Sequence, residues 1–219
     1  KLAEFEIPGY IVKSHPTCAG CFGVANIAEF GIAACDLDNS GAICSSEKSG
    51  SIKNFSELPI SGDSPDENGN IYDLSFSRNG HLMGVAVAYT WAPYTYEKAG
   101  FYCWSVKSFV GGYEAGVAAS HMSCQQLSPL DAAFIPAGEE DGPIVGVEFI
   151  SNCEVVILQH HVHEDKEGAT EEERKAARAK DKPRLKISVY TLDPERLQEA
   201  VPKCIQSLTI DTPDLTDPS

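Results

Sequence analysis

Hydrophobic and polar positions partly alternate through most of the chain after residue 70, and that pattern favours strands. These segments are also rich in aromatic and β-branched residues. The predicted strands are 71–80, 81–91, 100–112, 143–151, 154–163 and 184–192. Asn79-Gly80 predicts a hairpin between the first two, because this dipeptide tolerates the positive φ of a type I′ turn. The chain is therefore expected to be mostly β from residue 71 onward.

Three segments carry helix signals. The Ala-rich stretch 21–35 repeats its apolar positions at intervals of three and four, which predicts a helix. Thr170 and Glu173 have capping-box spacing and predict the start of a charged helix over 171–181. An aspartate followed by proline opens 193–202, a combination typical of a helix start.

Composition places the chain among folded globular proteins. Of its 219 residues, 42% are hydrophobic and 22% are charged. We expect one domain over 1–210 and a C-terminal tail over 211–219. The expected fold is mainly β, within the α+β class: a disulfide-bonded antiparallel β-sandwich or barrel with two or three peripheral helices.

Charge narrows the choice of partners. The chain has 17 basic and 32 acidic side chains, which gives a net charge of −15. Such a surplus argues against a nucleic-acid surface, because phosphate contacts need clustered Lys and Arg. No apolar run approaches the ~18–20 residues of a membrane-spanning helix, so we expect no membrane span.

The cysteines indicate an extracellular protein. Their even number, eight, and a first residue other than Met suggest disulfides and a removed signal peptide. The alternative is a cytosolic protein with reduced, buried thiols. Asn54 begins an N-x-S sequon, which makes it a candidate glycosylation site. The candidate disulfide cysteines are Cys18, Cys21, Cys35, Cys44, Cys103, Cys124, Cys153 and Cys204.

One acidic loop has the spacing of a calcium site. Asp36, Asp38 and Ser40 occupy positions 1, 3 and 5, Gly41 is sixth, and Glu47 is twelfth. Alternate oxygen side chains of this kind can surround Ca²⁺, and a glutamate at the twelfth position closes the shell. Over these twelve residues the loop resembles the EF-hand family, which implies bound Ca²⁺. The alternative is an acidic turn that holds a disulfide.

A histidine pair is the second metal candidate. His161 and His163 share one face of a predicted strand, so both rings can reach one Zn²⁺ or Cu²⁺. The pair resembles the His-x-His ligands of cupins, carbonic anhydrases and copper–zinc superoxide dismutases, and Glu167 has the cupin spacing. His81 and His121 are candidate third ligands. The alternative is a strand end that emerges into solvent.

The spacing Cys18-Ala-Gly-Cys21 resembles the thioredoxin redox motif. A following helix would lower a thiol pKa there, and that resemblance implies redox activity. Structural disulfides from these two cysteines to different partners are the favoured interpretation.

An aromatic group around a proline-containing connection is a candidate binding surface. Exposed rings stack on sugars or anchor a partner protein. The candidates are Trp91, Tyr94, Tyr96 and Trp104, and the alternative is that rings of this group fill a β core.

The sequence therefore favours a non-enzymatic function. No catalytic motif of a hydrolase, nucleotide-binding enzyme or metalloprotease is present, and we assign no catalytic residue. We expect a secreted, disulfide-rich interaction protein, such as an effector or toxin-like virulence protein, that binds an extracellular protein or glycan target. The alternatives are a metal-binding protein or metal-dependent enzyme that uses His161 and His163, and a carbohydrate-binding module.

Overall fold

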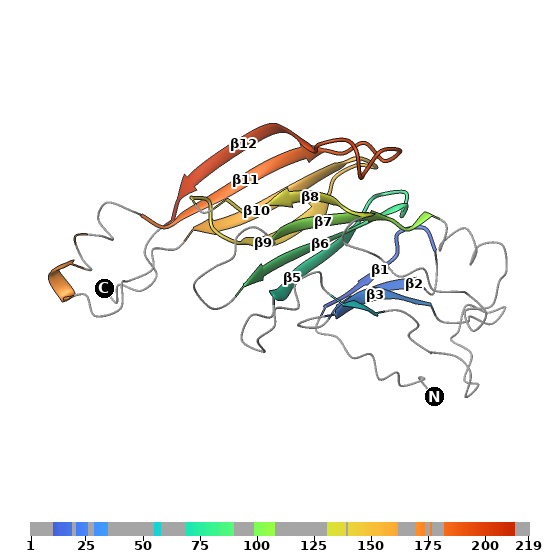
Figure 1. Ribbon diagram of the computed structural model, residues 1–219, viewed down its shortest axis with the longest axis horizontal. Helices are drawn as coiled ribbons and strands as arrows, with labels where there is room; N and C mark the ends of the chain where they lie inside the picture. The colour runs from blue at the N-terminus through green and yellow to red at the C-terminus, as the bar shows by residue number, and fades with distance from the viewer. Residues whose placement is uncertain are drawn as a thin grey trace.

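A computed structural model describes twelve strands in three four-stranded antiparallel sheets (Figure 1). The sheets do not close into a barrel, so the mainly β expectation is confirmed in its sandwich-like form. The described residues are 11–18, 21–25, 29–34, 55–57, 69–89, 99–107, 131–138, 140–161, 170–173, 176 and 182–212.

Each sheet takes its strands from one stretch of the chain. The N-terminal sheet contains β1 (Ile11–Ser14), β2 (Cys21–Ala25), β3 (Glu29–Ala34) and β4 (Phe55–Glu57), in that order. The central sheet contains β5 (Gly69–Phe76), β6 (Leu82–Tyr89), β7 (Gly100–Ser105) and β8 (Ala133–Pro136), in that order. The C-terminal sheet contains β9 (Ile144–Phe149), β10 (Glu154–His161), β11 (Arg184–Thr191) and β12 (Lys203–Asp211), in the order β12-β11-β10-β9.

The central sheet is covered on both faces. On one face Trp104 packs against Phe30 of the N-terminal sheet, with ring centroids 4.7 Å apart. On the other face Phe101 lies 6.3 Å from Phe149 of the C-terminal sheet, centroid to centroid. A strand buried on both faces needs apolar residues at consecutive positions rather than at alternate ones. Residues 82–88 of β6 are all buried, which explains their unbroken apolar run.

The helix predicted over 21–35 is wrong. The described parts of this segment are β2 and β3, which pair antiparallel with Gly23 opposite Ile32. A side chain at Gly23 would lie 2.5 Å from Leu74 of the central sheet. Small residues that resemble helix-forming alanine patterns therefore serve here to bring two sheets close together.

The predicted hairpin at Asn79-Gly80 is confirmed, although its turn has a different form. The amide of Gly80 donates to the carbonyl of Ser77, so Arg78 and Asn79 are the central turn residues. Gly80 follows them with φ of +69°. This geometry belongs to a turn followed by one left-handed glycine, not to a two-residue type I′ hairpin.

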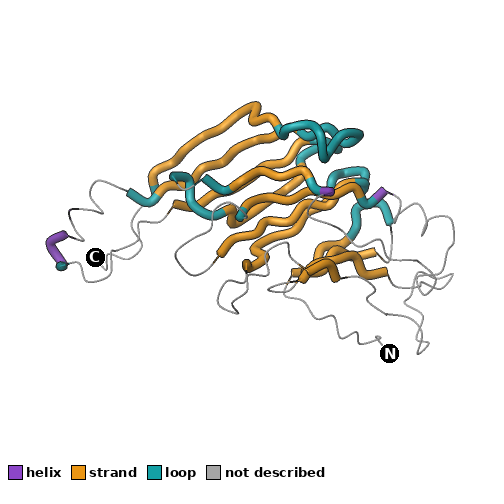
Figure 2. Tube along the Cα trace, viewed as in Figure 1, coloured by secondary structure: helices purple, strands orange, loops and turns teal. Residues whose placement is uncertain are grey.

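Helix content is very low in the described residues (Figure 2). The Thr170–Glu173 capping box is present, because the amide of Glu173 donates to Thr170 Oγ1 and the Glu173 carboxylate accepts from Thr170. The helix predicted over 193–202 is wrong, since this segment forms turns. Asp193 caps the first turn as a helix N-cap would, but a helix of so few residues is costly to nucleate.

A strand lies within each segment expected after residue 71, while 90–91, 108–112 and 162–163 lie outside the described residues. Two further strands were not expected. The short β8 pairs with β7 at the edge of the central sheet. The nine-residue β12 pairs with β11 at the edge of the C-terminal sheet. Domain boundaries remain a prediction.

Candidate binding surface and buried thiol cluster

Among the strands whose burial is described throughout, the edge strand β12 is the most exposed. All nine of its residues are exposed, although eight of them pair with β11 on its other side and Ile205 lies at a bulge. Of the seven exposed large hydrophobic side chains in the described residues, four lie in or beside it, namely Val201, Ile205, Leu208 and Ile210. An exposed, partly apolar edge is a ready template for pairing with another strand.

The apolar character of β12 continues across the outer face of its sheet. Strand register places Leu158, Ile187 and Leu208 side by side on β10, β11 and β12. Leu158 points away from the core because its neighbour Ile157 is fully buried and side chains alternate along a strand. We call Val156, Leu158, Leu185, Ile187, Val189, Leu208 and Ile210 the outer apolar face.

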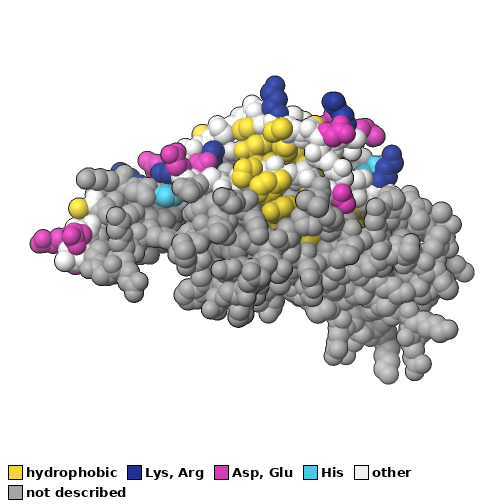
Figure 3. All heavy atoms as spheres, in the orientation of Figure 1, with side chains coloured by type: hydrophobic (Ala, Val, Ile, Leu, Met, Phe, Trp, Pro, Cys, Tyr) yellow, Lys and Arg dark blue, Asp and Glu magenta, His cyan; other side chains and the backbone are white. Residues whose placement is uncertain are grey.

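Figure 3 shows hydrophobic side chains gathered over the strands of this sheet, with charged side chains on either side. Most members of the outer apolar face are half-buried by their neighbours, while Leu208 and Ile210 are 56% and 44% exposed. A contiguous exposed apolar surface on a folded protein is a candidate interaction site.

The opposite edge of the same sheet is closed by side chains of the central sheet. The amide of Val147 donates to Asp73 Oδ2 at 3.0 Å, and the amide of Phe149 donates to Ser75 Oγ at 3.2 Å. Asp73 also lies 3.5 Å from Lys13 of β1, so it links all three sheets. These outward amides of β9 are therefore bonded, and β12 forms the other edge of the same sheet.

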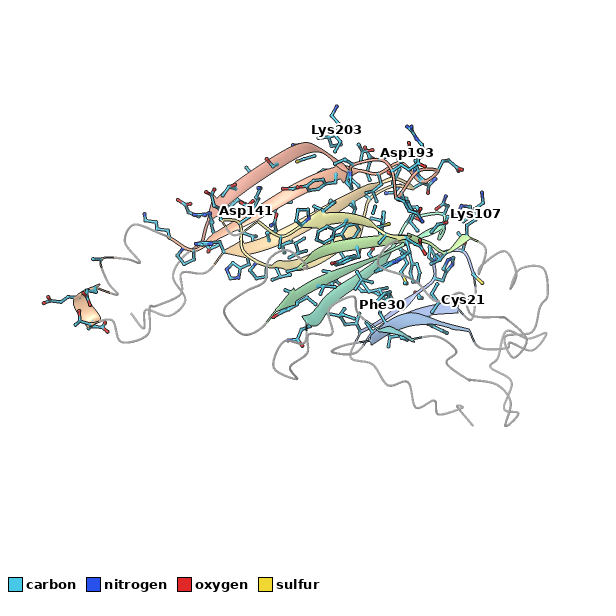
Figure 4. The ribbon with its side chains drawn as sticks, in the orientation of Figure 1. Cys21, Phe30, Lys107, Asp141, Asp193 and Lys203 are labelled. Carbon is cyan, nitrogen blue, oxygen red and sulfur yellow. The ribbon has the colours of Figure 1, made fainter. Side chains whose placement is uncertain are left out.

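The inner side of β11 is more polar and partly buried. Burial is the main cause that raises the pKa of Tyr190, and the neighbouring Cys204 adds to it. Lys186 pairs with Asp141, which fastens the turn before β9 to β11. Figure 4 shows Asp141 and Lys203 at separate places along the sheet.

A second cluster, of two thiols and one imidazole, lies between the N-terminal and central sheets. Cys18 Sγ and Cys21 Sγ are 3.0 Å apart, and both side chains are buried. His15 Nδ1 accepts from the amide of Cys18 at 3.0 Å. Its Nε2 therefore carries the proton and donates to the carbonyl of Gly80 at 2.8 Å. His15 is itself only 6% exposed.

The setting of Cys18 and Cys21 differs from the thioredoxin-like expectation. Cys21 begins strand β2, so no helix N-terminus follows to lower a thiol pKa. Elsewhere in the core, burial raises the pKa of the Cys103 thiol far above its usual range. Both features are typical of structural rather than nucleophilic cysteines.

No disulfide joins two cysteines of the described residues. Of the other cysteines in that part of the chain, Cys153 is half-buried and Cys204 is exposed. The disulfides proposed from the sequence therefore remain a prediction.

Three other predicted site residues have described positions. One of them, His81, follows the β5–β6 turn, and its amide donates to Asn79 Oδ1 at 3.1 Å. Trp104 is 1% exposed and packs on Phe30, so its ring fills the core and is not available on the surface. His161 ends β10 opposite Arg184. In the described portion of the chain, no three His, Cys, Asp or Glu residues are grouped as a metal site.

The remaining candidates lie outside the described residues, and they stay predictions. They are Asp36, Asp38, Ser40 and Glu47 of the calcium-like loop, His163 with its candidate co-ligands His121 and Glu167, Trp91, Tyr94, Tyr96, Asn54, Cys35, Cys44 and Cys124.

Sequence reasoning missed two contributors to these sites. The spacing His15-x-x-Cys18-x-x-Cys21 was available as a signal, but only the cysteines drew attention. The strand β12 alternates polar and apolar residues over 207–211, and this strand signal was also available but was not used.

Comparison with known protein families and with curated proteins gave no match. Among the described residues, no helix has both the length and the apolar character needed to cross a membrane.

Proposed function

We propose that this chain is an extracellular interaction protein that binds an extended segment of a partner protein along β12. The observation that carries the proposal is the exposed, partly apolar edge strand β12, continuous with the outer apolar face. Backbone groups of an open edge supply affinity for an added strand, and alternate side-chain positions supply specificity.

The outer apolar face defines the chemistry of the partner. Leu208 and Ile210 project on the same side as Ile187 and Leu185 of β11. An added strand with apolar side chains at alternate positions extends these rows by one strand. Polar or charged residues suit its other face, because Ser207 and Thr209 lie there on β12.

Charge favours β12 over the rest of the surface for such binding. The strand carries one lysine, Lys203, and one aspartate, Asp211, so its net charge is zero. The whole chain carries −15. An anionic partner segment therefore meets less repulsion at β12 than at an average position of this acidic surface.

The test uses synthetic ten-residue peptides that are unstructured alone and carry Val, Ile or Leu at alternate positions. Binding is measured by titration, and the site is mapped by amide hydrogen exchange. We expect the peptides to slow exchange of β12 amides. Half of the Leu208 side chain is exposed and becomes buried, so Leu208→Lys should weaken binding about 5- to 30-fold.

Val12→Lys is the matched control, because Val12 is 48% exposed on β1 in a different sheet. This variant should bind the peptides as the wild type does. Equal affinity for all three proteins, or protection that maps away from β12, would overturn the proposal. A loss of binding in both variants would show that the effect comes from added charge.

A further inference from the structure

We propose that Cys18 and Cys21 form a disulfide with each other, which closes the turn between β1 and β2. The two sulfur atoms lie 3.0 Å apart, about 1 Å more than an S–S bond.

The backbone at this position also suits the bond. The amide of Cys21 donates to the carbonyl of Cys18 at 3.2 Å, which is the hydrogen bond of a four-residue turn. Ends of such a turn lie less than about 7 Å apart between Cα atoms, and disulfides span about 4.4–6.8 Å. Side-chain rotation is therefore sufficient to join the two sulfurs.

The oxidation needs an electron acceptor of the disulfide class, such as glutathione disulfide. One cysteine thiolate attacks that disulfide and releases one glutathione thiol. The second thiolate then attacks the mixed disulfide, forms the Cys18–Cys21 bond and releases the second glutathione. Two protein thiols are oxidised and one glutathione disulfide is reduced to two thiols.

His15 connects this bond to the packing of two sheets. Its ring accepts from the amide of Cys18 and donates to Gly80 in the β5–β6 hairpin. It also packs edge-on against Phe76, with ring centroids 5.0 Å apart. A closed Cys18–Cys21 turn holds the ring in this position, so the bond stabilises the contact between the N-terminal and central sheets.

The pairing is tested on the full-length wild-type protein, equilibrated with reduced and oxidised glutathione and then blocked with N-ethylmaleimide without reduction. Combined cleavage after Lys and Glu releases residues 14–29, which contain Cys18 and Cys21 as their only cysteines. We expect this fragment to be free, unlabelled and two hydrogens lighter than its dithiol form.

The other early cysteines, Cys35 and Cys44, fall in the next fragment, 30–47. If residues 14–29 emerge attached to that fragment or to any other, the mutual pairing is wrong. If they carry two maleimide groups at every glutathione ratio, no disulfide forms there and the proposal is equally overturned.

The link to sheet packing has its own measurement, which needs no variant. Amide exchange at Cys18 and Gly80 is compared in oxidised and reduced wild-type protein. We expect about tenfold slower exchange in the oxidised state, because a short closed loop restricts local opening. Equal rates in both states would show that the bond does not support the contact. Neither experiment depends on β12, so their outcomes are independent of the proposed function.

Discussion

Replacing Gly80 with alanine tests the contact between the β5–β6 hairpin and the N-terminal sheet. Gly80 has φ of +69°, which L-residues with a side chain rarely adopt. An added Cβ would lie 1.9 Å from His15 Cε1, so the ring must move. Moving it breaks the 2.8 Å bond from His15 Nε2 to the Gly80 carbonyl.

The magnitude follows from these effects. A left-handed residue with a side chain costs about 1–2 kcal/mol. The lost hydrogen bond adds about 0.5–1.5 kcal/mol, and more where a buried group stays unpaired. We expect Gly80→Ala to lower the free energy of unfolding by about 2–4 kcal/mol. Gly146→Ala is the control, because its Cβ would lie 3.5 Å from Leu158 without a positive φ. That variant should stay within about 1 kcal/mol of the wild type.

The assay is chemical unfolding of Gly80→Ala, His15→Ala and the double variant. The clash needs both the ring and the new Cβ, so the double variant should lose about 1–2 kcal/mol less than the sum of the single losses. Additive losses would refute the reasoning. So would a Gly80→Ala loss no larger than that of Gly146→Ala.

Three further predictions concern other parts of the molecule. Asp73→Ala should lower the free energy of unfolding by about 1–3 kcal/mol and speed amide exchange at Val147, because that amide loses its acceptor; unchanged exchange would contradict this. Burial raises the pKa of Cys103, so iodoacetamide should label this thiol in guanidinium-unfolded protein but hardly in native protein, and similar rates would disprove its protection. The side chain of Arg196 is the main cause that lowers the pKa of Asp193, so Arg196→Gln should raise it in an NMR titration. The stability from this bond is present above the pKa of a free aspartate and is lost as the pH falls through the lowered value, so a titration unaffected by the substitution would remove Arg196 as the cause.

Sequence patterns predicted the strands whose environments are regular. The run LMGVAVAY was recognised because β-branched residues and consecutive apolar positions suit a strand covered on both faces. The helix predicted over 21–35 was wrong because small residues such as alanine and glycine fit both a helical pattern and a close contact between two sheets. Only the central sheet, through Leu74 and Phe76, decides between them, and that contact is not local.

Each candidate site likewise has a local part, which the sequence shows, and a part that depends on the fold. The spacing of Cys18 and Cys21 is local and was visible, whereas their neighbour Gly80 lies about sixty residues away and depends on the fold. The apolar surface that β12 shares with its neighbours arises from its register with β11, which places Leu208 beside Ile187. Neither residue is unusual by itself, so the pattern gave no reason to connect them.

In the part of the chain that the structure describes, the C-terminal sheet has one bonded edge, β9, and one exposed edge, β12, and this difference governs how copies of the chain can assemble. Asp73 and Ser75 occupy the outward amides of β9, so growth through that edge is blocked. If two copies joined at β12, the merged sheet would end in a blocked β9 at each side. Such a union terminates at two molecules and offers no end for a third. The same arrangement therefore prevents strand addition at the exposed apolar edge from continuing into a filament.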